Sequence, residues 1–438
     1  MNVNSVLGKN WLSKSYSEDT VNFLKDNFSL SEILSRLIAI RNIKLEEVKL
    51  FLNPRIKNLL PNPFTLKDME KTVERTIKAI IKKEKIGIFG DYDVDGATST
   101  AILGNYFNEV NQEIEIYIPD RKTEGYGPSK QGFEKLISYG AKLIFTVDCG
   151  TASFDTIDFS QKKNTDVLVL DHHQSELKLP NAFSIVNPNR HDDKSNLNYL
   201  CAAGVCLMFL VALNKRLREL EWFSKNNIKE PNLINFLDLV SLGTVCDVVP
   251  LTGLNRAIVS QGLEIFKKKS NLGLKTLKNI CGIESNLTTY HLGYILGPRI
   301  NAGGRVGKCS HGANLLLSKD TKEIFKIATE LESFNKERKL IELNMLKNIE
   351  KNISIDPKES VIVLSGHNWH GGTIGIIAAR LKEKYNKPTV IISVEKGLGR
   401  ASARSVVGFD IGTVIISAVQ SNILKKGGGH KMAAGFTI

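Results

Sequence analysis

From residue 86 onward, short apolar runs alternate with stretches that have the apolar spacing of helices. The runs are IGIFG (86–90), IEIYI (114–118), LIFTV (143–147) and DVLVL (166–170), each bounded by polar or glycine-rich residues. Short, continuously apolar strands that alternate with helices are typical of a parallel sheet covered on both faces. The pattern therefore predicts an α/β domain in this part of the chain.

Helical patterns flank these strands. Residues 1 to about 80 are predicted to be mainly helical, with a proline-broken connection at FLNPRIKNLLPNPF, and we interpret them as a lead-in. A second helical region is expected from about Tyr199 to Leu317. A single long helix is then predicted from Asp320 to about Asn352, because Asp320 and Glu323 fit an N-terminal capping arrangement and apolar residues recur near helical spacing.

A smaller α/β domain is predicted after the long helix. SVIVLSG and TVIISV have the composition of strands, and TIGIIAARLKEKY between them has that of a helix. The expected division is a helical lead-in over 1–80, a catalytic domain over 81–317, a connecting helix over 318–352 and a substrate-binding domain over 353–438. The expected fold class is α/β, with a parallel-sheet domain joined by a long helix to a smaller α/β domain.

Composition narrows the class of protein without fixing its function. The 438 residues exceed one ordinary core, and 42% hydrophobic with 24% charged residues is usual for a globular protein. The six cysteines form no C-x-x-C pair, which favours buried thiols over a zinc site or a disulfide framework. No apolar stretch approaches the ~20 residues of a membrane span, and the start lacks the pattern of a secretory signal. We therefore expect a cytoplasmic protein.

The formal net charge of +13 would attract phosphate backbones. A biased Lys-, Asn- and Ile-rich composition produces such a charge as well, so charge alone leaves the nucleic-acid partner open.

Three carboxylates follow the first strand directly. Asp91, Asp93 and Asp95 stand in GDYDVDG, immediately after IGIFG, and Gly96 permits a sharp turn into a helix. Open α/β sheets bind ligands at the carboxyl ends of their strands. A single D-x-D motif is weak evidence, because acidic loops are usually only solvated.

Two further strands end in the same chemistry. LIFTV leads to Asp148 in TVDCG, and DVLVL leads to Asp171, His172 and His173 in LDHHQ. Asp247, in the apolar segment GTVCDVVPL, would be costly to bury unless it is paired or liganded. Carboxylates mixed with imidazole favour manganese or magnesium over zinc. The number of ligands suffices for two ions, which a bridging carboxylate would hold ~3.5–4 Å apart.

These motifs resemble a known family. DYDVDG, TVDCG, LDHH and GTVCDVVPL, in that order, are similar to the four motifs of the DHH phosphoesterase superfamily. GPRINAGGR (297–305), WHGGTIGIIAARL (369–381), SARSVVGF (402–409) and GGGHKMAAGF (427–436) resemble the RecJ family with its DHHA1 domain. The resemblance extends from about Phe51 to Ile438. It implies a single-stranded-DNA-specific 5′–3′ exonuclease that releases mononucleotides in DNA repair and recombination.

The resemblance also assigns roles to residues. It implies that two Mn or Mg ions are held by Asp93, Asp95, Asp148, His172 and Asp247, with Asp148 bridging. Asp91, Asp148 and His173 are the implied catalytic residues, with Asp91 as a supporting acid and His173 beside the scissile phosphate. The expected substrate-binding residues are Arg121, Arg299, Asn301, Arg305, His370, Ser402, Arg404, Gly428, Gly429 and His430, the last three in a glycine-rich loop.

Single-stranded DNA is the implied partner, with a single-strand-binding protein and a helicase as further candidates and no membrane. Members of the family continue past GGGHxxAAG into an OB-fold, which this sequence does not show before Ile438. We therefore expect a complete active site with weaker grip on the strand. Two alternatives stay open: a small-substrate DHH enzyme for short oligonucleotides, cyclic dinucleotides or pyrophosphate, and a non-catalytic replication scaffold of the same fold.

Overall fold

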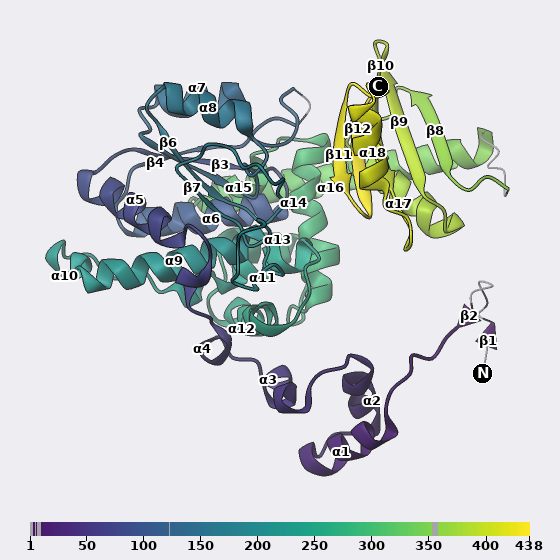
Figure 1. Ribbon diagram of the computed structural model, residues 1–438, viewed down its shortest axis with the longest axis horizontal. Helices are drawn as coiled ribbons and strands as arrows, with labels where there is room; N and C mark the ends of the chain where they lie inside the picture. The colour runs from purple at the N-terminus through teal and green to yellow at the C-terminus, as the bar shows by residue number, and fades with distance from the viewer. Residues whose placement is uncertain (1–2, 5, 7–9, 122, 353–357) are drawn as a thin grey trace.

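The computed structural model describes the whole chain except residues 1–2, 5, 7–9, 122 and 353–357. Two α/β bodies are joined by the long helix α16 (Thr321–Asn352), as Figure 1 shows. The predicted fold class is therefore confirmed. No described helix is both long enough and apolar enough to cross a membrane.

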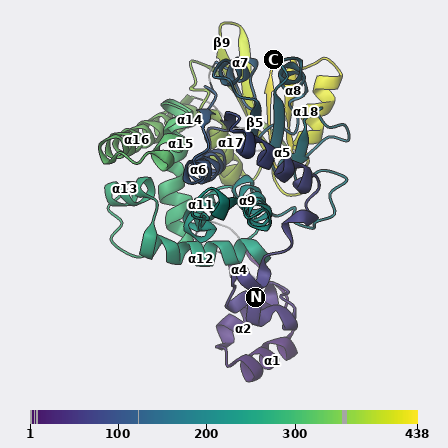
Figure 2. The same cartoon turned by 90° about the vertical axis from the view of Figure 1, so that its left-hand side faces the viewer.

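The described residues from 3 to 52 extend away from both bodies in the two perpendicular views (Figures 1 and 2), whereas Ile56, Leu60 and Phe64 pack against the core of the larger body. Leu24, Ile38 and Val48 form a small core of their own, and Arg256 Nε donates a 2.7 Å hydrogen bond to the carbonyl of Phe51. The elements are β1 (Val3–Asn4), β2 (Asn10–Trp11), α1 (Glu18–Phe28), α2 (Glu32–Ile40), η1 (Leu45–Glu47), α3 (Val48–Leu52), α4 (Ile56–Leu59) and η2 (Pro63–Thr65).

The larger body contains a five-stranded sheet in which all strands are parallel, in the order β4-β3-β5-β6-β7. The strands are β3 (Ile86–Gly90), β4 (Ile114–Tyr117), β5 (Leu143–Val147), β6 (Asp166–Leu170) and β7 (Ser184–Val186). The four predicted strands are confirmed, although β4 ends one residue earlier than expected, and β7 is an addition. Because the strand order reverses between β3 and β5, a ligand-binding crevice is expected where these two strands end.

Helices cover both faces of this sheet. Phe89 and Ile144 point into a small core with α7 (Lys130–Ser138) and α8 (Phe154–Lys162). Ile88 and Phe145 point the other way, into the main core. The remaining helices of this body are α5 (Met69–Lys82), α6 (Val94–Glu109), α9 (Ala202–Glu219), α10 (Trp222–Lys225), η3 (Leu233–Phe236), α11 (Leu237–Cys246), α12 (Gly253–Lys269), α13 (Leu272–Ile280), η4 (His291–Leu296), α14 (Gly297–Val306) and α15 (His311–Leu317).

The main core begins before the boundary that the sequence predicts at residue 80. Leu66, Met69 and Val73 are buried in it, so α5 packs with the sheet and is not part of a separate lead-in. The long helix joins the two bodies through its two ends. Ile324 in its first turn lies in the main core, whereas Ile349 near its last turn is buried in the core of the smaller body.

The smaller body is a second five-stranded sheet, in the order β11-β12-β10-β9-β8. Its elements are β8 (Ile362–His367), α17 (Ile374–Tyr385), β9 (Thr389–Glu395), β10 (Leu398–Arg404), α18 (Ile411–Gln420), β11 (Lys426–His430) and β12 (Ala433–Thr437). Only β8 and β9 pair in parallel. The glycine-rich segment 427–430, expected as a loop, is instead the edge strand β11, because it pairs with β12 along its whole length.

Candidate active site

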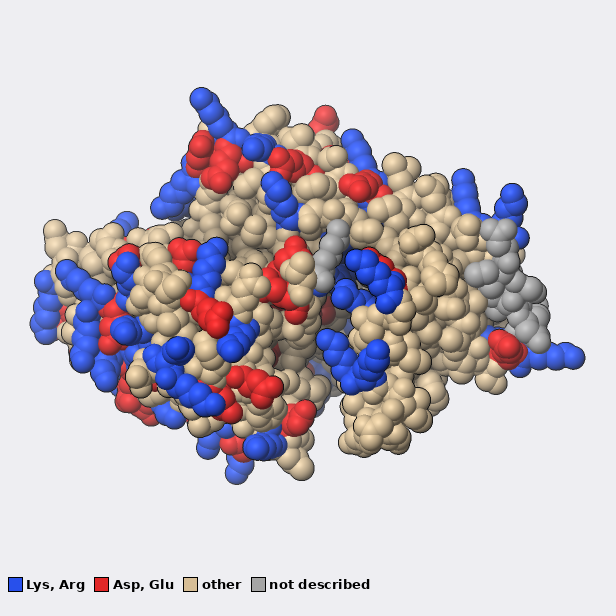
Figure 3. Space-filling model, turned by 90° about the horizontal axis from the view of Figure 1, so that it is seen from above, with Lys and Arg blue, Asp and Glu red and all other residues tan. Residues whose placement is uncertain are grey.

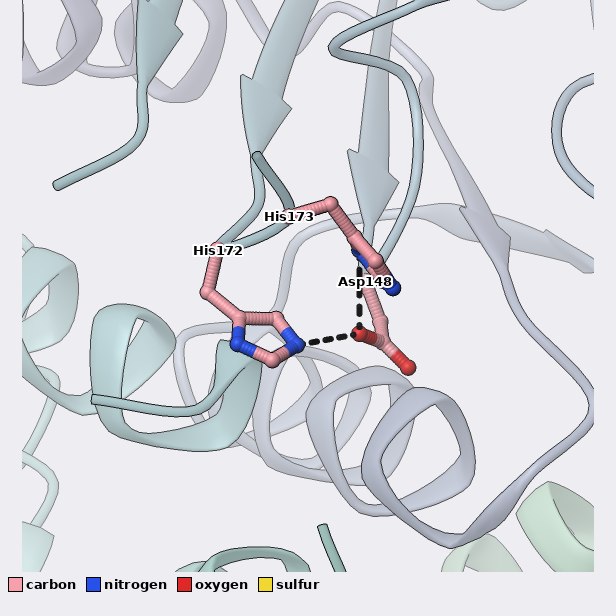
Figure 4. Close-up of side chains that lie close together, drawn as sticks. All are labelled: Asp148, His172 and His173. Carbon is pink, nitrogen blue, oxygen red and sulfur yellow. Dashed lines mark ion pairs between the residues drawn. The ribbon is translucent and has the colours of Figure 1, made fainter. Parts of the chain in front are cut away.

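The acidic and imidazole side chains that end three strands meet at the carboxyl edge of the larger sheet. Figure 4 shows Asp148, at the end of β5, facing the two histidines that follow β6. Ligand atoms lie within 4.8 Å of one another in three groups: Asp91 with Asp93 and Asp148, Asp95 with His172 and Asp247, and Asp148 with His172 and His173. The structure therefore brings together every residue that the sequence proposes as a metal ligand.

The turn after β3 is built by tight backbone contacts. Asp93 caps α6, since its carboxylate accepts a 3.0 Å hydrogen bond from the amide of Gly96. A Cβ atom at Gly96 would lie 2.5 Å from the carbonyl oxygen of Asp91, so this position requires glycine. Asp95 accepts hydrogen bonds of 2.6 and 3.0 Å from the amides of Ala202 and Ala203, which fixes it to the start of α9.

Two residues of the site have a left-handed backbone. Asp148 has φ of +59°, which aspartate tolerates better than most residues. Val248, the residue after Asp247, has φ of +61° and is 86% exposed. A β-branched residue in this conformation is strained, and such strain gathers at functional sites. The tertiary fold therefore holds the turn that presents Asp247 in a backbone conformation that Val248 disfavours.

We expect Val248→Asn to raise the free energy of unfolding by about 1 kcal/mol, because asparagine adopts the left-handed conformation at lower cost. Urea denaturation in the presence of a chelator measures this change. Val407→Asn is the matched control, because Val407 is also exposed but does not have a positive φ. Equal effects of the two substitutions would show that side-chain polarity, and not backbone strain, decides the stability.

The centre of the cluster contains buried polar atoms without hydrogen-bond partners. They are Asp91 Oδ1, Asp148 Oδ1 and His172 Nε2. His172 Nε2 lies 3.3 Å from Asp148 Oδ1 and 3.8 Å from an oxygen of Asp95, but neither approach forms a hydrogen bond. His172 Nδ1 lies 3.7 Å from Asp247. Buried polar atoms without partners are costly, so the arrangement fits shared coordination of divalent cations.

The pKa directions agree with this fit. Burial, and then the nearby charges of Asp93 and Asp95, hold the pKa of Asp148 well above its usual range. Burial and the charge of Asp95 also raise the pKa of Asp247 to about 8. The pKa values of Asp91 and Asp95 are raised as well, again mainly by burial. Without a cation these carboxylates destabilise one another, and a divalent ion would offset both the burial and the repulsion.

His173 has different surroundings from His172. Its Nδ1 lies 2.7 Å from Asp171, and its Nε2 lies 3.1 Å from the hydroxyl of Tyr126. Burial lowers the pKa of His173, but the charge and hydrogen bond of Asp171 outweigh it and raise the pKa to about 9. Burial likewise opposes ionisation of Asp171, yet His173 holds the pKa of this carboxyl below its usual range. Asp171 therefore fixes the orientation of the His173 ring and, without a cation in the cluster, favours its charged form.

Three residues that support the histidines are missing from the set proposed from the sequence. Asp171, which precedes them, orients His173. The Asn187 amide donates hydrogen bonds of 2.8 Å to the carbonyl of His173 and 2.9 Å to Thr151. Tyr126 also donates to the carbonyl of Asp148, at 3.2 Å. The place of Asp171 at the end of a predicted strand was the available signal, and Asn187 follows the unpredicted strand β7.

Three of the predicted substrate-binding arginines converge near the cluster. Burial first, and then the charges of Arg121, Arg338 and Arg404, lower the pKa of Arg305 to about 10. Arg305 donates a 3.1 Å hydrogen bond to the carbonyl of Gly372, so it links the two bodies. Arg121 lies over the ring of Tyr92, with its guanidinium carbon 5.4 Å from the centroid. Crowded guanidiniums repel one another, and an anion would relieve that repulsion.

Strand register places four residues of the smaller body on one face of its sheet. Ser402 and Gly428 both pair with Gly435, while Arg404 and His430 both pair with Ala433. Alternate residues of a strand share a face. Arg404 Nη1 donates to Ser402 Oγ at 3.1 Å. Burial, and then the charges of Arg404 and His173, lower the pKa of His430, so this face lies toward the cluster.

The other predicted substrate-binding residues differ in their surroundings. Arg299 forms a half-buried ion pair with Glu332 at 2.5 Å and donates to the carbonyl of Ile295, which makes it a packing residue of α14 in this conformation. Asn301 lies half-buried on the same helix. His370 Nδ1 accepts a 3.2 Å hydrogen bond from the amide of Gly372. Gly429 lies between Gly428 and His430 in β11. In Figure 3, Lys and Arg side chains border a hollow where the two bodies meet.

Comparisons with known proteins agree with this geometry. The model of the DHH family, N-terminal domain, matches residues 85–244, and that of the DHHA1 domain matches residues 358–438. A single-stranded-DNA-specific exonuclease RecJ of Haemophilus influenzae is 36% identical over 93% of this chain and 72% of its own length. The chain belongs to the RecJ family.

The chain spans only about half the length of some of the RecJ proteins that it matches. RecJ of Bacillus subtilis is 32% identical over 98% of this chain, which spans only 53% of that protein. The crystal structure of Thermus thermophilus RecJ in complex with Mn²⁺ superposes with a TM-score of 0.81 at 27% identity, covering 96% of this chain and 58% of the other. A manganese-bound exonuclease RecJ gives a TM-score of 0.72 at 30% identity, covering 85% of this chain and 90% of the other.

Proposed function

We propose that this chain is a metal-dependent exonuclease that hydrolyses single-stranded DNA in the 5′–3′ direction and releases mononucleotides. The observation that carries the proposal is the buried acid–histidine cluster, with its unpartnered Asp91, Asp148 and His172 atoms, beside three converging guanidiniums. Residues 81–317 act as the catalytic domain and residues 353–438 as the substrate-binding domain, with the helix over 318–352 between them.

The cluster fits two divalent cations held by Asp93, Asp95, Asp148, His172 and Asp247, with Asp148 shared between them. Manganese and magnesium are supported by the carboxylate-rich ligand set and by the Mn²⁺ and Mg²⁺ complexes of Thermus thermophilus RecJ. When bound, the ions supply an activated water and stabilise the charge that develops on the phosphoryl group. Asp91 supports the cluster from beside Asp93 and Asp148.

The chain's own groups bind and orient the phosphates. His173, oriented by Asp171, is placed to contact a non-bridging oxygen of the scissile phosphate. Arg121, Arg305 and Arg404 bring fixed positive charge from both bodies close together. The terminal nucleotide then lies against the face of Ser402, Gly428 and His430. Arg299, Asn301, His370 and Gly429 remain proposed contacts.

The cellular setting follows from the proposed substrate. We assign the chain to the cytoplasm and to DNA repair and recombination. A single-strand-binding protein and a helicase are its proposed partners, since both generate or hold single-stranded DNA.

End-labelled DNA tests the function. We expect a 5′-labelled single strand to release labelled mononucleotide with Mn²⁺ or Mg²⁺, none in a chelator, and little from a blunt duplex. A 3′-labelled strand should shorten progressively, which reports polarity. Consumption of dinucleotides with no attack on long strands would instead favour a short-oligonucleotide phosphodiesterase, and metal-dependent binding without hydrolysis would favour a non-catalytic scaffold.

A further inference from the structure

A pair of exposed, stacked tyrosines marks the π-helical turn η4 between α13 and α14. The rings of Tyr290 and Tyr294 lie 5.3 Å apart at 25°, and the residues are 59% and 74% exposed. Leu292 and Leu296 of the same turn are fully buried. The turn thus buries its aliphatic side chains and presents its aromatic rings to solvent, and π-helical turns are frequent at functional sites.

The aromatic pair is held in place before any ligand binds. The ring of His291 packs edge-on against Tyr290, with centroids 5.8 Å apart. His291 is itself fixed, because its Nδ1 accepts from the amide of Thr288 at 3.1 Å and lies 2.9 Å from the Thr288 hydroxyl. Fixed aromatic faces lose little conformational entropy when a planar partner binds.

The turn packs on the helix end that carries a proposed metal ligand. Cys246 Sγ lies 3.4 Å from the carbonyl of Leu292, and a Cβ atom at Gly293 would lie 3.4 Å from Val245. The next residue after Cys246 is Asp247, so the tyrosines lie on the order of 10 Å from this carboxylate. Exposed Val248 extends the apolar surface on the far side of Asp247.

We propose that Tyr290 and Tyr294 form a stacking platform for unpaired bases of the DNA strand on the 3′ side of the scissile phosphate. The inference rests on the proposed exonuclease function and adds the site that holds the retained strand. The smaller body meets the larger one where the carbonyl of Gly372 accepts a hydrogen bond from Arg305, and its His430 lies within electrostatic range of His173. Asp247 instead faces the opposite ring nitrogen of His172. The platform therefore lies where the strand continues after the terminal nucleotide.

Stacking also explains how such a site would treat sequence and strandedness. Every base has an aromatic face, so a tyrosine platform binds without base preference. Bases inside a duplex are already stacked and paired, and they cannot reach the rings without melting. The platform thus selects unpaired DNA by a mechanism separate from the width of the hollow between the two bodies.

Equilibrium binding in a chelator tests the platform without any turnover. Fluorescence anisotropy would compare a 5′-phosphorylated, 3′-dye-labelled thymidine 12-mer with versions that carry one abasic site at each of positions 2–6. For the parent chain we expect one or two adjacent abasic sites to weaken binding by about 5- to 30-fold, the range for loss of a stacked base. For Tyr290→Ala/Tyr294→Ala, the full 12-mer should bind that much more weakly, and the same abasic sites should have no further effect.

Matched variants separate stacking from folding. Tyr294→Trp should keep the abasic effect of the parent chain. Tyr294→Leu should lose it, although both substitutions place an apolar side chain at this position. Leu177→Ala, at a residue that is 88% exposed outside this turn, should leave binding at the parent level. Equal abasic penalties in the parent and in the double variant would overturn the proposal, as would full binding by Tyr294→Leu.

The proposal and the exonuclease function can fail separately. A parent chain that shows the abasic effect but releases no nucleotide with Mn²⁺ would retain the platform and reject the nuclease assignment. Nucleotide release without any abasic effect would retain the nuclease assignment and reject the platform.

Discussion

Asp148→Asn is expected to lower the rate of single-strand hydrolysis on the order of 10³-fold or more, the loss that follows when several kcal/mol of charge stabilisation disappear. Asp148 belongs to two of the three ligand groups, so the change affects both proposed ions at once. The asparagine side chain keeps the shape of aspartate but supplies one weaker oxygen ligand. Single-turnover release of a 5′-labelled nucleotide at saturating enzyme measures the chemical step directly.

The same substitution lowers activity but should raise the thermal stability of the metal-free protein. Burial and neighbouring carboxylates raise the pKa of Asp148, so removing this charge relieves repulsion. We expect the Tm of Asp148→Asn in a chelator to exceed that of the parent, and the gain in Tm on adding Mn²⁺ to shrink. Asp158→Asn on α8, an exposed acid outside the cluster, should change neither quantity. A variant that keeps parental activity and parental Mn²⁺ stabilisation would refute the shared-ligand role.

Three of the strands that the sequence predicted share one physical property. β3, β5 and β6 are buried on both faces, so each is a continuous apolar run between polar ends. β7 has only three residues, SIV, and its hydrogen bonds to β6 come from the tertiary fold, which no local pattern records. The glycine-rich β11 has the composition of a turn, and it becomes a strand because β12 supplies its partners.

The candidate site, like the strands, was predictable only where a local sequence pattern determines it. Strand ends in a parallel sheet share one edge, so the sequence alone predicts that Asp91, Asp148 and His172 lie close together, as the structure shows. The support from Asn187 comes through β7 and was therefore missed. The positions of Arg404 and His430 relative to the cluster depend on how the two bodies pack, so these residues were proposed only from the family resemblance and not from periodicity.

Arg404→Ala is expected to weaken binding of single-stranded DNA by about 10- to 100-fold, the range for loss of a hydrogen bond to a charged group. Burial and the charge of Arg121 lower the pKa of Arg404, which shows that the guanidinium lies among like charges. Such crowding is costly in the free protein and favourable once a phosphate binds. The variant should therefore lose affinity for DNA with no loss in the free energy of unfolding.

A salt titration distinguishes a phosphate contact from a packing role. Binding of a thymidine oligonucleotide in a chelator, measured from low to moderate salt, should show a log–log slope shallower by about 1 for Arg404→Ala. Arg404→Lys should keep the slope but recover only part of the affinity, since lysine retains the charge and loses the fork that matches a phosphate. Lys396→Asn, in the turn that precedes β10 and roughly 25 Å from Arg404, removes one charge from the smaller body and should bind as the parent does.

The three variants together decide what the smaller body contributes. If Arg404→Ala and Lys396→Asn weaken binding equally, the smaller body contributes only a diffuse positive field, and the shared face of Ser402, Arg404 and His430 has no specific ligand. If only Arg404→Ala does so, the phosphate lies against that face. Since Arg305 is hydrogen-bonded to Gly372 across the hollow, the bound strand would then be held by both bodies at once. Separating the bodies would release the strand, which makes the packing of α16 on both cores a condition for grip as well as for folding.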